Sequence, residues 1–134
     1  MQSISARAAL AVGLAILLSA CGGKSATAPS AVDTGAPGPS GATITILANG
    51  ALSPKTVQIA VGQSVTFVNN DVRAHDMTSD PHPTHTQCPA INVVAVLSPG
   101  QTKLTNALST ATTCGFHDHG DPENTNLQGS ITIK

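Results

Sequence analysis

The chain of 134 residues contains no tryptophan, no tyrosine and only two phenylalanines, so aromatic side chains contribute little to any core it forms. A small core built from Val, Ile, Leu and Ala is thin, and a metal or a disulfide helps to hold such a domain together. Charged residues are also scarce, at 10% of the chain with a net charge of −1. Because nucleic-acid binding needs a concentrated basic surface, this composition excludes a nucleic-acid partner.

Residues 1–20 have the pattern of a secretory signal peptide. Arg7 supplies a positive charge, and the apolar run that follows over 8–18 is too short to span a bilayer as a mature helix. The run leads into Leu-Ser-Ala-Cys-Gly, which resembles the bacterial lipobox, where the cysteine becomes the lipidated N-terminus after cleavage. The resemblance implies that Cys21 carries a lipid that anchors the protein to a membrane outside the cytoplasm. Gly22 after this cysteine fits the periplasmic side of an outer membrane.

The rest of the chain divides into a linker and one domain. Residues 21–41 are mostly Gly, Ser, Ala, Thr and Pro, a composition that cannot bury enough apolar surface to order itself and indicates a flexible linker. Residues 42–134 have the length of a single small domain.

Apolar and polar residues alternate in short segments of this domain, with Gly and Pro turns between them and no helical periodicity. Residues 80–89, with three prolines, have the composition of a loop. This pattern predicts an all-β fold, a β-sandwich with Greek-key connections. The expected strands lie at 42–47, 56–61, 64–68, 93–97, 102–108 and 130–134.

A cysteine and two histidines near the C-terminus suggest a metal site. Cys114, His117 and His119 lie within six residues, and His75 lies upstream. A thiolate with two imidazoles suits copper, because sulfur favours Cu(I) and nitrogen accepts either oxidation state. We therefore expect copper to be bound by His75, Cys114 and His117, with His119 as a further candidate. Residues three apart in an extended strand point to opposite faces, so Cys114 and His117 converge only if the chain turns at Gly115.

Over 42–134 the sequence resembles the cupredoxins, the small blue copper proteins. The resemblance rests on Val65-Thr-Phe-Val-Asn-Asn-Asp71 ahead of His75, on Leu97-Ser-Pro-Gly-Gln101, on the Cys-x-x-His pair and on the closing residues 127–133. It implies a cupredoxin-like sandwich that exchanges single electrons with a redox partner, and is not an enzyme. That family usually has methionine where Leu127 stands. Leucine cannot coordinate a metal, so we expect Leu127 to line the axial position.

A second interpretation pairs Cys88 with Cys114, because cysteines outside the cytoplasm commonly form disulfides. Copper would then be held by histidines alone, His75, His117 and His119, with His82 and His85 nearby. The protein would be a carrier or buffer that exchanges copper with a donor or acceptor protein. His117 and His119, two residues apart, share a face if the segment stays extended.

Two loop histidines and one short motif complete the candidates. His82 and His85 are interpreted either as an auxiliary metal site or as solvated loop histidines. The prolines that keep this loop extended favour solvated loop histidines. Residues 115–119, Gly-Phe-His-Asp-His, are similar to a segment of the copper-zinc superoxide dismutases, which gives a third, enzymatic interpretation. In that family further histidines follow the segment, whereas none follows here.

Overall fold

The computed structural model describes residues 38–134. The predicted signal peptide, Cys21 and the linker as far as residue 37 lie outside the described residues. No α-helix occurs in the described part of the chain, and none of its helices is long and apolar enough to cross a membrane. The elements are β1 (Ser40–Ile46), β2 (Leu52–Ser53), β3 (Thr56–Ile59), β4 (Ser64–Asn69), β5 (His75–Ser79), the 3-10 helix η1 (Pro89–Ile91), β6 (Ala95–Leu97), β7 (Thr102–Leu104), β8 (Thr112–Asp118), the 3-10 helix η2 (Thr125–Leu127) and β9 (Gly129–Ile133).

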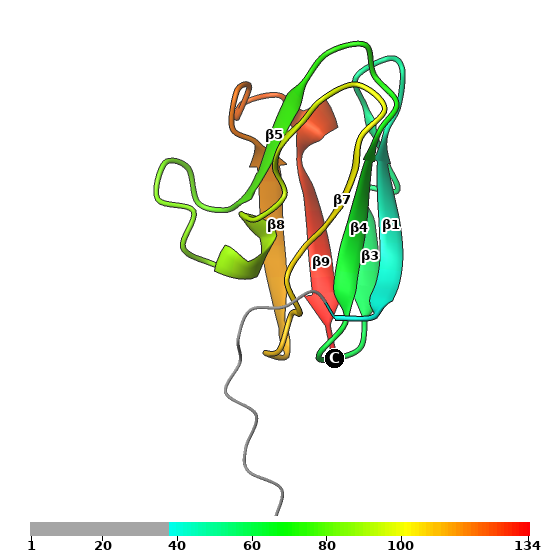
Figure 1. Ribbon diagram of the computed structural model, residues 1–134. Helices are drawn as coiled ribbons and strands as arrows, with labels where there is room; N and C mark the ends of the chain where they lie inside the picture. The colour runs from blue at the N-terminus through cyan, green and yellow to red at the C-terminus, as the bar shows by residue number, and fades with distance from the viewer. Residues whose placement is uncertain (1–37) are drawn as a thin grey trace, which may run out of the picture. The chain divides into compact units, whose positions relative to one another are not determined.

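The strands form two sheets, which confirms the predicted β-sandwich (Figure 1). One sheet has the order β2-β1-β4-β7 and the other the order β3-β9-β8-β5-β6. Both sheets are mixed, because β1 runs parallel to β4 and β3 runs parallel to β9 while the other pairs are antiparallel. Strand β8 is therefore an interior strand, flanked by β9 along its first half and by β5 along its second half.

The space between the sheets is filled by alternate side chains of the strands. In β1 and β9 the isoleucines are buried while their neighbours are less so, as the period of two in a strand requires. The only two phenylalanines of the protein meet in this core. Phe67 of β4 and Phe116 of β8 are fully buried and pack edge to face, with ring centroids 5.2 Å apart. This pair packs across the space between the two sheets and supplies the phenyl surface of the core.

Several strand bounds differ from the expected ones, and β3 ends at Ile59, two residues before its expected end. Strand β1 begins at Ser40, two residues before the predicted start of the domain. The run at 93–97 is a strand only from residue 95, because Val94 donates its N–H to the carbonyl of Ile91 and completes the turn after η1. Strand β7 ends at Leu104, and Thr105 donates its N–H to the carbonyl of Val65 instead of continuing a regular ladder.

A long connection leaves the end of β5 and returns to η1 over residues 80–88, which we call the β5–η1 loop. Figure 1 shows this loop projecting beside β5 and β8. It is fastened to β8 at both ends: Asp80 donates its N–H to the carbonyl of Gly115, and Gln87 accepts a hydrogen bond from the N–H of Gly115. The loop is therefore held against β8. The sequence predicted a loop at 80–89 but not this contact.

Candidate metal centre

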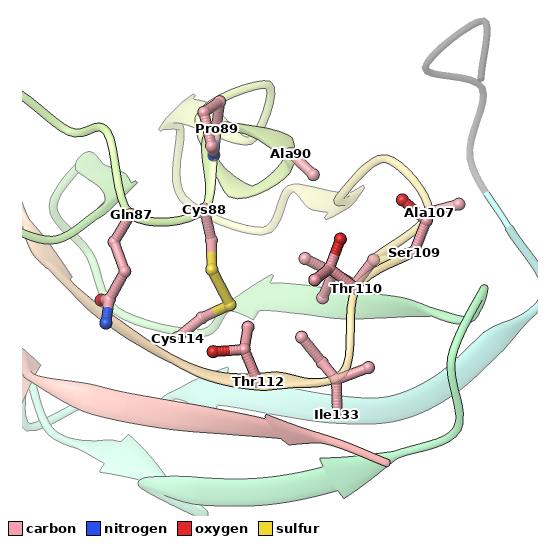
Figure 2. Close-up of a pocket in the computed structure, with 11 residues that line it drawn as sticks. Gln87, Cys88, Pro89, Ala90, Ala107, Ser109, Thr110, Thr112, Cys114 and Ile133 are labelled. Carbon is pink, nitrogen blue, oxygen red and sulfur yellow. A yellow bond between two sulfur atoms is a disulfide. The ribbon is translucent and has the colours of Figure 1, made fainter. Parts of the chain in front are cut away.

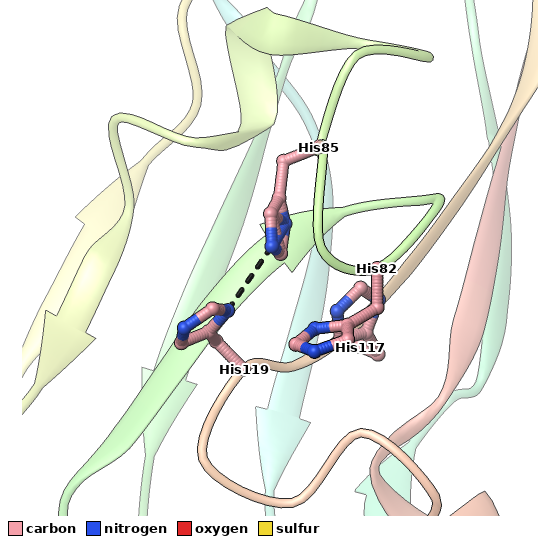
Figure 3. Close-up of side chains that lie close together, drawn as sticks. All are labelled: His82, His85, His117 and His119. Atoms are coloured by element: carbon pink, nitrogen blue, oxygen red, sulfur yellow. Dashed lines mark hydrogen bonds between the residues drawn. The ribbon is translucent and has the colours of Figure 1, made fainter.

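Four histidines come together beside the end of β8. Two of them belong to the β5–η1 loop, one lies in β8 and one follows β8 directly (Figure 3). Each offers one ring nitrogen, and these four atoms lie within 4.8 Å of one another. We call this group the histidine tetrad; its members are His82, His85, His117 and His119.

Strand geometry accounts for the half of the tetrad that β8 supplies. Successive side chains of a strand alternate between its faces, so the side chains at 115, 117 and 119 share one face as long as the chain stays extended. The neighbouring strand on this side of β8 is β5, in which Thr78 is paired with His117. The β5–η1 loop begins one residue after β5 and turns back over this face, which brings His82 and His85 to the same place.

His117 is the best anchored member of the tetrad. Its side chain is 3% exposed, and its Nδ1 lies 2.6 Å from a carboxylate oxygen of Asp80. Because a carboxylate can only accept, Nδ1 carries the proton and Nε2 keeps a lone pair in the neutral ring. That Nε2 is buried and has no hydrogen-bond partner. Buried polar atoms in folded proteins are nearly always paired, so an unpartnered imidazole nitrogen facing three other imidazoles marks a ligand position.

His85 is anchored through its other nitrogen in a similar way. Its Nδ1 lies 3.1 Å from the hydroxyl of Thr78 and 3.3 Å from the carbonyl oxygen of Ser79. The Thr78 hydroxyl donates its own hydrogen to Asn92, so it accepts from His85. Nδ1 of His85 is therefore the donor, and Nε2 faces Nδ1 of His119 at 3.0 Å (Figure 3).

The backbone and the electrostatics of His85 also suit a ligand. It has a φ of 52°, in the left-handed region where non-glycine residues are uncommon and where they cluster at functional sites. Burial lowers the pKa of His85 below its usual value, and the positive charges that His117, His119 and His82 carry when protonated lower the pKa further. A lowered pKa keeps the ring neutral, and only the neutral ring has a lone pair for a metal.

The dimensions of the tetrad fit a first-row transition metal. With metal–nitrogen bonds of about 2.0 Å, the edges of a tetrahedron of nitrogens measure about 3.3 Å. The pair His85 and His119 is already near that length, and the widest separation of 4.8 Å would have to shrink by about 1.5 Å, which side-chain rotation can supply. Imidazole ligands suit Zn, Cu, Fe and Ni, and among divalent ions Cu²⁺ binds such sites most tightly.

The structure places Cys114 differently from the predicted copper ligand. Its sulfur is bonded to Cys88, with the two Cα atoms 5.8 Å apart, so no thiolate is available (Figure 2). Strand β8 continues without a turn from Thr112 to Asp118, and Cys114 and His117 accordingly lie on opposite faces. The pairing of Cys88 with Cys114 is the one that the second interpretation of the sequence expected.

His75 is also separate from the tetrad. Its Nδ1 lies 2.7 Å from a carboxylate oxygen of Asp118 and its Nε2 lies 3.0 Å from one of Asp71, and all three side chains are buried. With an acceptor at each ring nitrogen, His75 has no lone pair directed at an open position. The hydrogen bond from His75 is the main reason that the pKa of Asp71 lies below its usual value. His75 therefore has a structural role, and the predicted set of His75, Cys114 and His117 is not assembled.

Leu127 is almost completely buried and lines a pocket of about 310 Å³ together with His75 and Asp118. No member of the tetrad lines this pocket. Leu127 is thus placed beside His75, the expected first ligand, and away from the group of histidines that the structure brings together.

Sequence reasoning undervalued His82 and His85. His82 is exposed, as a solvated loop histidine would be, but both side chains belong to the tetrad. One signal was present in the sequence: Cys88 follows His85 by three residues and Cys114 precedes His117 by three, so a disulfide between these cysteines brings the β5–η1 loop close to β8.

Solved structures that match this fold include several cupredoxins. A purple cupredoxin from Nitrosopumilus maritimus matches with a TM-score of 0.56 and 20% identity, over 69% of this chain and 99% of that chain. The oxidized plastocyanin of Dryopteris crassirhizoma matches with a TM-score of 0.53 and 18% identity, over 69% and 99%. An oxidized amicyanin with a single substitution matches with a TM-score of 0.52 and 16% identity, over 70% and 82%.

No protein-family model and no curated protein matches the sequence. At these identities the likeness defines the class of fold, and that fold is the cupredoxin-like β-sandwich expected from the sequence.

Proposed function

We propose that this protein binds copper outside the cytoplasm through its histidine tetrad, and that it carries or buffers the metal. The observation that carries the proposal is the buried, unpartnered Nε2 of His117, which faces three further imidazoles and is held in the ligand tautomer by Asp80. Two exposed members, His82 and His119, leave one side of the site open to solvent. A metal held partly by exposed ligands can be exchanged with a donor or acceptor protein.

The disulfide supports the extracytoplasmic part of the proposal. Disulfides persist in oxidising compartments and are rare in the cytoplasm, so the pairing of Cys88 with Cys114 fits a secreted or periplasmic protein. It also agrees with the lipobox-like sequence around Cys21, from which we propose attachment to a membrane through a lipid. Labelling cells with a radioactive fatty acid tests the attachment: the full chain should be labelled, and a Cys21→Ala variant should not.

One-electron transfer is the second candidate function, and the cupredoxin-like fold favours it. A reversible potential for the copper-loaded protein, within the range that respiratory electron carriers span, would support it. A copper ion that is released on reduction would support carriage and oppose a redox shuttle, because a shuttle must keep its metal in both oxidation states.

Titration of the full chain with Cu(II), followed by visible absorption and electron paramagnetic resonance, tests the site. We expect one tightly bound equivalent with weak d-d absorption and nitrogen couplings, since the ligands are imidazoles. An intense thiolate charge-transfer band would overturn the tetrad as the site. Four single alanine substitutions should each weaken binding, while the control His75→Gln, which keeps a donor between two carboxylates, should leave it unchanged. The four are His82→Ala, His85→Ala, His117→Ala and His119→Ala.

A further inference from the structure

Asp80 lies outside the tetrad but holds its most buried member. The Oδ1 atom of this carboxylate accepts the hydrogen bond from Nδ1 of His117 at 2.6 Å. Within residues 38–134 this nitrogen has no other hydrogen-bond partner, so the orientation and the tautomer of His117 depend on Asp80. A carboxylate on the far nitrogen of a metal-binding imidazole fixes the ring and increases its basicity.

Gly115 provides the space in which this carboxylate sits. A Cβ built on Gly115 would collide with Oδ2 of Asp80 and lie 2.9 Å from its Cγ, which is closer than real Cβ contacts. Gly115 does not have a positive φ, so its role here is the room that it leaves and not an unusual backbone conformation. The same residue accepts the backbone N–H of Asp80 through its carbonyl, at 3.0 Å. The backbone N–H of Asp80 is thus bonded to Gly115, and its side-chain carboxylate is bonded to His117.

We propose that Asp80 is the positioning residue of the metal site, and that Gly115 is required because it admits the Asp80 carboxylate between the β5–η1 loop and β8. This inference rests on the proposed function, since it assigns to Asp80 the task of presenting Nε2 of His117 as a ligand. The carboxylate does not bind the metal. It acts through His117, and its partly exposed position, with 44% of the side chain accessible, lets it be replaced without emptying the core.

Two variants remove this interaction by independent routes. Asp80→Ala deletes the carboxylate, and Gly115→Ala keeps it but displaces it by collision. Both should weaken Cu(II) binding by about ten- to 100-fold, the usual effect of losing such an outer partner. Asp80→Asn keeps an acceptor without its charge and should lie between wild type and Asp80→Ala. This variant also replaces Asp80→Ala if the latter does not fold, as judged by circular dichroism.

Matched controls separate positioning from general effects of charge and volume. Asp121→Ala removes an exposed carboxylate near the same end of β8, which accepts a hydrogen bond from the side chain of Asn124. Gly120→Ala adds the same methyl group close to the tetrad, where the new Cβ would meet only Asp118, at an ordinary 3.5 Å. Both controls should bind Cu(II) with affinity close to that of the wild type.

The decisive measurement is the tautomer of His117 in the metal-free full chain, read from the ring ¹⁵N chemical shifts by NMR. We expect the Nδ1–H tautomer in the wild type and a shift toward Nε2–H in Asp80→Ala and Gly115→Ala. An Nε2–H tautomer in the wild type would overturn the inference. So would a variant whose tautomer changes while its Cu(II) affinity does not. If the wild type bound no Cu(II), the proposed function would fail, whereas the metal-free NMR spectrum would still show whether Asp80 fixes the ring.

Discussion

Removal of the Cys88–Cys114 disulfide is expected to destabilise the protein strongly. The bond closes a loop of 26 residues, and the chain-entropy relation gives about 3.5 kcal/mol for a loop of that length. A small domain with few aromatic side chains has a total stability of about 5–15 kcal/mol, so the disulfide supplies a large share of it. Both sulfurs are buried, and replacing them with alanine also leaves a small unfilled volume.

The measurement is urea denaturation of the full chain and of its Cys88→Ala/Cys114→Ala variant. The protein has no tryptophan or tyrosine, so far-UV circular dichroism should report the unfolding instead of fluorescence. The free energy of unfolding should fall by at least about 3.5 kcal/mol, and the slope should rise, because the unfolded chain without the cross-link exposes more surface. The third cysteine supplies the control: Cys21→Ala lies outside the disulfide and should leave the midpoint where it is.

Two results would refute this reasoning. Alkylation of the native protein followed by peptide mass spectrometry should leave Cys88 and Cys114 unmodified, and labelling of both would show that the bond is not formed. A Cys88→Ala variant whose stability lies within about 0.5 kcal/mol of the wild type, the size of an ordinary surface effect, would show that the pairing contributes nothing.

Three further predictions follow from the core and from the surroundings of His75. Phe116→Ala should lower the free energy of unfolding by about 3–5 kcal/mol, because it removes a fully buried ring that packs on Phe67, whereas Phe116→Leu should cost less; a loss below about 1 kcal/mol would contradict this. Asp71→Asn should reduce the destabilisation that acid causes. The folded-state pKa of Asp71 is lowered by His75, so its stabilisation is full above the usual value of 3.8 and is lost as the pH falls further. Acid titrations of the variant and the wild type that run in parallel below that pH would refute the linkage. Leu127→Met should leave the visible and paramagnetic spectra of the copper-loaded protein unchanged, since Leu127 lines the pocket of His75; a new charge-transfer band would contradict the tetrad.

The class of fold could be predicted from the sequence because its signal is local. Alternating apolar residues in the segments that became β1, β3, β4 and β9 determine which face of each strand is buried, and the Gly and Pro turns separate them. The short strands were less certain. At Val93 and Val94 an apolar run completes a turn because of a hydrogen bond to Ile91, and apolar composition alone cannot distinguish that turn from a strand.

Composition and motifs also showed that this end of the domain holds metal-binding side chains. All five histidines lie between residues 75 and 119, and Cys-x-x-His-x-His indicated that β8 would contribute to a site. The sequence could not show which histidines meet. That depends on whether the chain turns at Gly115, which glycine permits but does not require. In the structure β8 runs straight through Gly115, so Cys114 faces away from His117.

The sequence by itself thus determined the β-sandwich, the candidate residues of the site and the two alternatives for Cys114. Only the tertiary structure decided between them, because the deciding contacts join residues far apart in the chain. The disulfide spans 26 residues, the Asp80–His117 hydrogen bond spans 37 and the His85–His119 contact spans 34. Such contacts arise when the β5–η1 loop packs on β8, and a local pattern of residue types carries no information about which distant segment will cover a given strand face.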